Sequence, residues 1–335
     1  MSATREHIED WLSEIERRGT NDATELLSHF WQLGPNDSEA VAPLLATLRN
    51  EASTLRSFAA HWLGAVGNGS GEVATALSDA LLSDDEHLRE CASVAIGRVG
   101  YLDDTIRARL ASLLESERDL ARMYAAFSLL QLAPNEPEPL EVLRGARASS
   151  TVWVRNYAGG ALASLHATVP SAIDDAICFL DDDYDPTVED IARRLVNAPP
   201  DAVVPRLLRV VREGEPRAKA GALHCLKERG LNAYAYRQAI IDTLVSTCLP
   251  TDACEADLTL SRLAANVAQS VGLDAPVIVE RLRVLLTSRD DWLAEQAAKA
   301  LLSFSGLADD VRCEADDTLR RIWPDASPRR RVGPG

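Results

Sequence analysis

The sequence predicts an all-α fold, an α-solenoid of stacked antiparallel helix pairs, and three observations lead to this prediction. A motif of Arg, two variable residues and Ala recurs four times at an identical spacing of 33 residues. Each recurrence follows the same order of a first helical pattern, a short polar or acidic turn and a second helical pattern. The chain of 335 residues is 46% hydrophobic and only 5% aromatic, which suits closely packed helices with a core of Ala, Leu and Val.

The motif begins at Arg56, Arg89, Arg122 and Arg155. With the Arg counted as position zero, position three is always Ala and position seven is always Leu or Ile. At about 100° per residue, positions three, seven and eight lie on one helical stripe. Small side chains on such a stripe let neighbouring helices approach closely. Recurrence of one such unit indicates a solenoid, in which each unit buries its apolar face only against its neighbours.

The elements before the motif predict an N-terminal helical cap over residues 1–36. Two amphipathic segments, residues 5–18 and 22–33, lie there, and Gly19 and the Gly34-Pro35 pair interrupt them. The repeat array is expected over residues 37–306. The first helices of its clear units are expected at residues 38–50, 71–83, 103–116 and 138–148.

After residue 170 the motif weakens, but the alternation of helices continues. Glu189 and Lys219 take the place of the motif Arg in the next two second helices, and further units run over about residues 236–272 and 275–306. A helix within residues 307–326 is expected to close the stack, and residues 327–335 (a run rich in Arg, Gly and Pro) are expected to be a disordered basic tail. Together these patterns predict about eight helical pairs.

The windows LRECASVAIGRVG and VRNYAGGALASL, with acidic turns such as residues 81–85 before them, resemble HEAT repeats. The likeness is greatest to the short subtype found in phycobilisome lyases, and it covers roughly residues 38–306. It implies a HEAT-like superhelix whose second helices line a concave surface. It also implies a binding scaffold, since enzymes are a minority among such proteins.

The repeated charges have a functional and a structural interpretation. In the functional interpretation, the four motif arginines form a ladder that recognises phosphates or carboxylates. We favour a structural ladder, in which Asp84, Asp85 and Asp119 cap the second helices and the motif arginines bridge to the turn of the adjacent unit.

Positions two and five of the second helices predict a site for a partner protein or peptide. The candidate residues are Phe58, His61, Cys91, Tyr124, Phe127 and Tyr157. On a helical wheel they lie opposite the Ala and Leu stripe, so they would form an apolar ridge that binds a partner's helix or extended segment. The alternative is that they pack against the first helix of their own unit, because wheel angles do not determine which face is open.

The formal net charge of −16 and the pI near 4.9 disfavour a nucleic-acid partner, because long-range repulsion opposes binding to phosphates. One stretch inverts this charge, with basic residues at Arg193, Arg194, Arg206, Arg209, Arg212, Arg217, Lys219, Lys227 and Arg229. Such a stretch could bind an acidic peptide, a phosphate or RNA. Its residues are expected on both first and second helices, however, which favours scattered solvated charge over one patch.

The sequence predicts no catalytic constellation, no metal site and no cofactor. It contains no Gly-rich phosphate loop, nucleophile elbow or HExxH motif. The spacing of the six cysteines matches no standard zinc pattern, so they are expected to be reduced thiols. No apolar run approaches the roughly 20 residues of a membrane span, and the charged N-terminus does not resemble a signal peptide, so a cytoplasmic location without membrane insertion is expected.

These observations predict a non-enzymatic scaffold or adaptor that binds a partner peptide or protein on its concave surface. Two alternatives remain open. One is a lyase-like or other enzyme subunit that handles a cofactor or a modified residue in the groove. The other is nucleic-acid binding through the segment from Arg193 to Arg229.

Overall fold

The computed structural model describes residues 4–324, and the predicted basic tail lies outside them. The described residues contain α-helices and short 3-10 helices, with no β-strand. Contacts divide the chain into two compact units, Met1–Ala172 and Ile173–Gly335. Each unit is a stack of antiparallel helix pairs, so the prediction of an all-α solenoid fold is confirmed.

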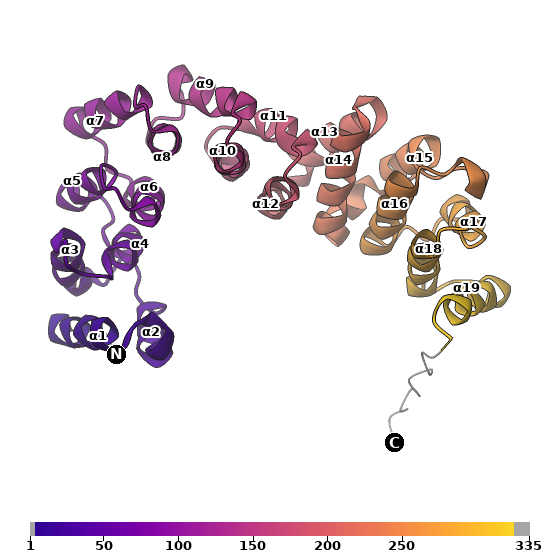
Figure 1. Cartoon of the computed structure of the whole chain (residues 1–335), viewed down its shortest axis with the longest axis horizontal. Coiled ribbons are helices and arrows are strands. Elements are labelled where there is room, and N and C mark those ends of the chain that lie inside the picture. Colours follow the sequence, from indigo (N-terminus) through magenta and orange to yellow (C-terminus); the bar gives the residue numbers. More distant parts are fainter. Residues whose placement is uncertain (1–3, 325–335) are drawn as a thin grey trace. The chain divides into compact units, whose positions relative to one another are not determined.

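In the first unit, α3, α5, α7 and α9 form one layer and α4, α6, α8 and α10 form a second layer beside it (Figure 1). The helices are α1 (Arg5–Arg18), α2 (Thr24–Phe30), α3 (Val41–Arg49), α4 (Arg56–Val66), α5 (Gly71–Ala80), α6 (Glu86–Val99), α7 (Asp104–Leu114), α8 (Asp119–Leu132), α9 (Pro137–Gly145) and α10 (Val152–Ser164).

The second unit repeats this order, with α12, α14, α16 and α18 as second helices. Its elements are α11 (Ala172–Ile177), η5 (Cys178–Asp181), α12 (Asp185–Leu195), α13 (Pro200–Glu213), α14 (Pro216–Arg229), η6 (Gly230–Tyr236), α15 (Arg237–Thr247), η7 (Ala253–Glu255), α16 (Leu258–Val271), α17 (Pro276–Leu285), α18 (Asp291–Ser303) and α19 (Asp309–Ile322). The helix predicted to close the stack corresponds to α19, which packs against α18.

The motif stripe forms the interior of the second-helix layer. The stripe residues with no exposed surface are Ala59, Ala92, Ala125 and Ala158 at position three and Leu63, Ile96, Leu129 and Leu162 at position seven. Glycines on this layer permit contacts that a larger residue would prevent. A Cβ placed on Gly64 of α4 would lie 2.8 Å from the Cα of Ala95 on α6. Backbones of consecutive repeats therefore meet almost directly.

The motif arginines hold the turn within their own unit, where we expected a bridge to the adjacent unit. Arg56 donates to the Leu48 carbonyl at 3.0 Å, and Arg89 donates to the Ser83 carbonyl at 2.7 Å. Arg155 likewise donates to the Ser149 carbonyl at 3.0 Å. These carbonyls lie at the end of the first helix or in the turn after it, so each Arg fixes the angle between the two helices of a pair.

The predicted acidic partners have different roles. Asp85 caps α6 as expected, since its carboxylate accepts from the backbone N–H groups of His87 and Leu88 at 3.0 and 3.2 Å. Asp84 accepts from Arg118 of the next repeat at 2.8 Å, which is an ion pair between units. Asp119, in contrast, pairs with Arg122 one turn along the same helix.

A buried arginine joins two repeats in the second unit. Arg229, at the end of α14, is only 2% exposed and donates to the carbonyls of Leu195 and Ala198, the latter at 2.9 Å. Leu195 is the last residue of α12, where a cation also interacts favourably with the helix dipole, and Ala198 lies in the turn that follows. The contact fixes the C-terminal ends of α12 and α14 against each other.

We predict that replacing Gly221 by Ala destabilises the protein by about 1–3 kcal/mol. A Cβ at this position of α14 would lie 2.3 Å from the carbonyl oxygen of Leu180, so the neighbouring backbone would have to move. Gly145→Ala in α9 is the matched control, because its Cβ meets no atom within 4 Å and Ala favours the helix. Urea unfolding measures both variants, and equal stabilities would contradict the proposed close approach.

Candidate functional site

The predicted aromatic stripe of the first unit is largely packed. Tyr124 and Phe127 on α8 are 2% and 5% exposed, so the expectation of an open stripe is not met at these two positions. The Tyr124 ring packs edge-to-face on Tyr157 of α10 with centroids 4.5 Å apart, and Phe127 also contacts Tyr157. They therefore pack across repeats within the second-helix layer, which neither of the two interpretations of the sequence included.

A polar network beneath these rings explains why the site is closed. The hydroxyl of Ser93 on α6 donates to the Tyr124 carbonyl at 2.8 Å and lies 3.1 Å from the hydroxyl of Ser128. Ser93 and Ser128 have no exposed surface, so these hydrogen bonds satisfy hydroxyls that would otherwise be buried at a cost. Burial strongly raises the pKa of Tyr124. The network gives α6 and α8 a fixed register.

The other four stripe residues, Phe58, His61, Cys91 and Tyr157, are half-buried on the same layer. Phe58 packs edge-to-face on Phe30 of α2 at 4.8 Å, and His61 contacts Trp62. Burial lowers the pKa of His61, helped by Arg98, and burial raises the pKa of Cys91 to about 11. The Cys91 thiol is therefore protonated near pH 7 and is a weak nucleophile.

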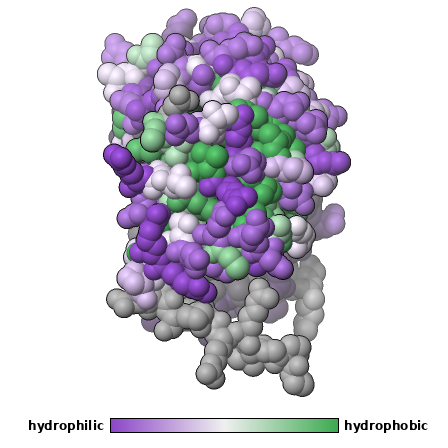
Figure 2. Space-filling model, turned by 90° about the vertical axis from the view of Figure 1, so that its right-hand side faces the viewer, coloured by the Kyte–Doolittle hydropathy of each residue, from purple (hydrophilic) through white to green (hydrophobic). Residues whose placement is uncertain are grey.

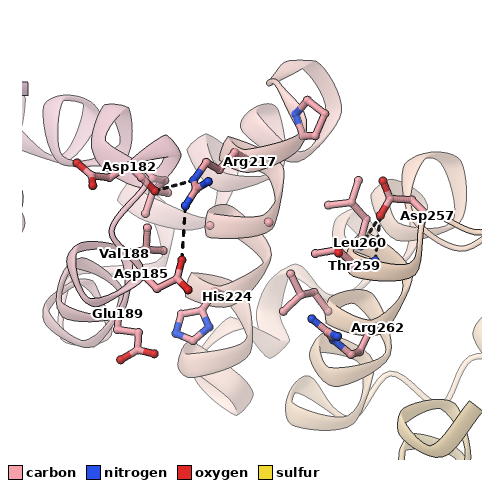
Figure 3. A pocket seen from close by; sticks show the side chains of 15 residues that line it. Asp182, Asp185, Val188, Glu189, Arg217, His224, Asp257, Thr259, Leu260 and Arg262 are labelled. Carbon is pink, nitrogen blue, oxygen red and sulfur yellow. Dashed lines mark hydrogen bonds and ion pairs between the residues drawn. The ribbon is translucent and has the colours of Figure 1, made fainter. Parts of the chain in front are cut away.

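The second unit contains a groove of about 520 Å³ between α12, α14 and α16 (Figure 3). Its lining residues are Leu180, Asp182, Asp185, Val188, Glu189, Pro216, Arg217, Ala220, Gly221, His224, Asp257, Thr259, Leu260, Arg262 and Leu263. Helix α14 supplies the floor and its two neighbours supply the walls. Pockets of this volume are typical of sites that enclose a small ligand or a few residues of a peptide.

Small residues on α14 create the depth of this groove. Ala220 and Gly221 line the groove and stand between Arg217 and His224 in the sequence of this helix. Gly221 lets α14 approach the backbone of Leu180 in η5, and neither Gly221 nor Ala220 has a long side chain that would fill the groove. Val188 on α12 and Leu263 on α16 add apolar surface from the sides. The base of the groove is therefore apolar.

The α12 wall carries acidic side chains. Arg217 donates to the Asp182 carbonyl at 2.7 Å and lies 3.7 Å from the Asp185 carboxylate, whose side chain is 89% exposed. Glu189 is exposed and, within the described part of the chain, makes no ion pair. This wall thus presents carboxylates that are open to solvent.

The α16 wall carries an arginine held by an aromatic ring. The guanidinium of Arg262 lies 3.6 Å from the ring centroid of Trp292 on α18, and Trp292 is 57% exposed. Asp257 precedes this helix, and its carboxylate caps α16 by accepting from the N–H groups of Thr259 and Leu260 at 3.0 and 2.9 Å. Arg262 is therefore the main charged group that this wall offers.

His224 lies low in the groove and is mainly neutral at pH 7. Burial is the largest cause of its lowered pKa, and Lys227 lowers it further, against the opposing effect of Glu228 and Glu189. Its Nε2 atom lies 4.0 Å from the Glu228 carboxylate. A neutral imidazole offers one hydrogen-bond donor and one acceptor, which suits contact with a peptide backbone.

The basic segment of the second unit does not form a single patch. Arg206 and Arg209 on α13 both lie near Asp174, at 2.7 and 3.7 Å. Arg193 and Arg194 on α12 share Asp190. These carboxylates neutralise much of the positive charge, which weakens the nucleic-acid alternative.

The sequence interpretation did not single out Trp292 and Arg262. The sequence does contain a pattern that points to Trp292. This residue stands five residues before Ala297, and Trp153 likewise stands five residues before the motif residue Ala158. Both tryptophans are more than half exposed. An aromatic residue that recurs at the start of second helices therefore marks this layer, although it occurs in only two repeats.

Among residues 4–324, no group of three or more His, Cys, Asp or Glu side chains is arranged to hold a metal ion. The helices of this same region include none that is both long and apolar enough to cross a membrane.

The comparisons with known proteins identify the fold. No protein-family model and no curated protein sequence matches the chain. The karyopherin Kap121p bound to the SUMO protease Ulp1p aligns with a TM-score of 0.51 and 16% identity, over 96% of this chain and 39% of Kap121p. Kap121p bound to Pho4p aligns with a TM-score of 0.51 and 17% identity, over 94% of this chain and 38% of Kap121p. The chain therefore shares a HEAT-like helical-repeat fold and spans about two fifths of the length of Kap121p.

The CpcE–CpcF complex of phycocyanin lyase from Nostoc also aligns, over 84% of this chain and 94% of that chain, with 18% identity. Its TM-score is 0.30, which is too low to establish a common arrangement of repeats. The expected likeness to lyase-type repeats in particular stays a prediction.

We predict that the protein loses stability as the pH falls below about 6.5, partly through His224. The fold lowers the pKa of this residue from 6.5, so the unfolded chain takes up the proton first. The stability that the neutral His224 contributes is fully present above the pKa that this residue has in the unfolded chain. It is lost as the pH falls from that value to the lower pKa of the folded protein. His224→Gln should reduce the difference in urea midpoint between pH 7.5 and pH 5.5. An unchanged difference would show that His224 is not desolvated.

Proposed function

We propose that this chain is a non-enzymatic scaffold that binds an extended segment of a partner protein in the groove between α12, α14 and α16. The observation that supports this most is the combination of apolar lining, at Ala220 on the floor and Leu263 on the α16 wall, with charged groups on the walls at Glu189 and Arg262. Apolar surface at the base favours burial of a side chain, and polar groups at the rim fix orientation.

The construction of the groove also supports binding with little reorganisation. Its three helices pack through buried stripes, and Arg229 joins the ends of α12 and α14. Most of the conformational entropy lost on binding would therefore be lost by the partner, and the scaffold would lose little. Kap121p, which has the same kind of fold, has been captured with Ulp1p and with Pho4p, so such repeats can present a protein-binding surface.

We propose a smaller contact area on the first unit, made of the half-buried residues Phe58, His61, Cys91 and Tyr157. Tyr124 and Phe127 would support this area from beneath and would not contact the partner themselves. The enzyme alternative has no comparable observation in its favour, because burial makes Cys91 a weak nucleophile.

Another apolar surface must be distinguished from the groove. Apolar side chains gather within a hydrophilic surround on the side of the molecule that bears α15 and α17 (Figure 2). Val277, at the start of α17, is 41% exposed. Such an area can adsorb apolar segments without specificity, so it needs its own control.

We predict that Ala220→Trp weakens partner binding by at least about tenfold, which corresponds to roughly 1.4 kcal/mol. The indole would fill the centre of the groove floor. Partners captured by the immobilised full chain would be identified, and their affinities for each variant measured by titration. Ala239→Trp, the matched control, places the same ring at an exposed position of α15. Val277→Ser tests the apolar area on the side of α15 and α17.

The two controls should leave the affinity unchanged, with circular dichroism confirming that all variants are folded. An Ala220→Trp variant that binds as tightly as the original chain would remove the groove from consideration. Loss of binding in Val277→Ser alone would move the site to the α15 and α17 side. A chain that captures no partner would contradict the scaffold function.

A further inference from the structure

We infer that the groove selects a dipolar segment, in which an apolar residue is flanked by a basic residue that faces α12 and an acidic residue that faces α16. This inference rests on the proposed function and specifies the chemistry of the partner. Some of the charged groups that line the groove already interact with the chain itself, and the others remain for a partner.

Two of the four carboxylates that line the groove are occupied by backbone groups. Asp182 is buried and accepts from the N–H of Tyr184 at 2.8 Å, and Asp257 caps α16. Asp185 and Glu189 on α12 remain, and both are exposed. Asp185 lies 3.7 Å from Arg217, beyond a direct hydrogen bond, so its oxygens can still accept from a partner.

Glu189 is the carboxylate of this wall that makes no ion pair within the described part of the chain. It projects from α12 on the same side as His224, one turn beyond Asp185 (Figure 3). His224 does not neutralise it, because burial keeps the imidazole mainly uncharged at pH 7. A Lys or Arg of the partner would therefore gain an ion pair that the free protein lacks.

The opposite wall offers the complementary charge. Trp292 interacts with the face of the Arg262 guanidinium, and among the side chains that the structure describes no carboxylate lies within ion-pair distance of this group. A guanidinium donates hydrogen bonds from its edge, in the plane of its five N–H groups. Stacking on Trp292 therefore positions Arg262 without using its donors, and its edge can bind a carboxylate with two hydrogen bonds.

Segments with one sign of charge fit this groove less well. A phosphate-rich or acidic segment would meet Asp185 and Glu189 in a chain whose net charge is −16. A wholly basic segment would place one of its charges against Arg262. Charges at the rim of an interface contribute more to selectivity than to affinity, so discrimination among partners is the expected result.

The test uses synthetic peptides in which a central Leu has one Lys and one Glu, placed one to three residues away on either side and in both orders. Peptides with two Lys, two Glu or two Gln at the same positions are the comparison. Fluorescence anisotropy with the full chain should show that the best Lys/Glu peptide binds at least about threefold more tightly than any single-sign or neutral peptide.

Charge reversal in the protein gives the sharper result. Glu189→Lys should weaken binding of the Lys/Glu peptide at least about threefold and strengthen binding of the two-Glu peptide, and Arg262→Glu should instead favour the two-Lys peptide. Glu213→Lys, an exposed reversal at the end of α13, is the matched control and should change neither. Circular dichroism of each variant confirms that it is folded.

The failures of the two proposals are distinguishable. Peptides that bind the original chain equally well, and lose affinity equally in Ala220→Trp, would leave the groove as the site and overturn the dipolar preference. The same conclusion would follow if both reversals behaved like Glu213→Lys. An unchanged capture of whole partners by Ala220→Trp would, in contrast, overturn the binding function of the groove as well.

Discussion

The close approach of consecutive second helices is the constraint on which the rest of this structure depends. One helix pair has an apolar face that only the next pair can cover, so the repeats are stable only as a stack. Ala at position three and glycines such as Gly64 allow the backbones to meet almost directly. A larger side chain there would separate the repeats and expose the aliphatic residues at position seven.

Arginines fix the relative orientation of the helices, which apolar packing alone does not determine. Apolar contact is not directional, whereas Arg89 and Arg155 each donate to a carbonyl of the turn that precedes their helix. Arg229 extends the same chemistry between repeats by satisfying carbonyls at the end of α12. The repeated arginines therefore have a structural role, because they fix the positions of helices. Other residues form the groove of the second unit.

The groove arises from the same small residues that make the stack possible. Gly221 brings α14 against Leu180, and Ala220 beside it leaves the space between α12 and α16 unfilled. The charged groups of the groove are Glu189 on one wall and Arg262, held by Trp292, on the other. Architecture supplies the depth of the site, and these few residues supply its chemistry.

The sequence by itself determined the fold class, the buried Ala and Leu stripe and the cap at Asp85, because these depend on spacings within one helix or one turn. Only the tertiary structure decided that Tyr124 and Phe127 are buried, since a helical wheel gives the direction of a side chain and not what the next repeat places over it. The contact between Arg262 and Trp292 could not be predicted from the sequence for the same reason. These residues are 30 positions apart, and the distance between them is set by how two helices pack.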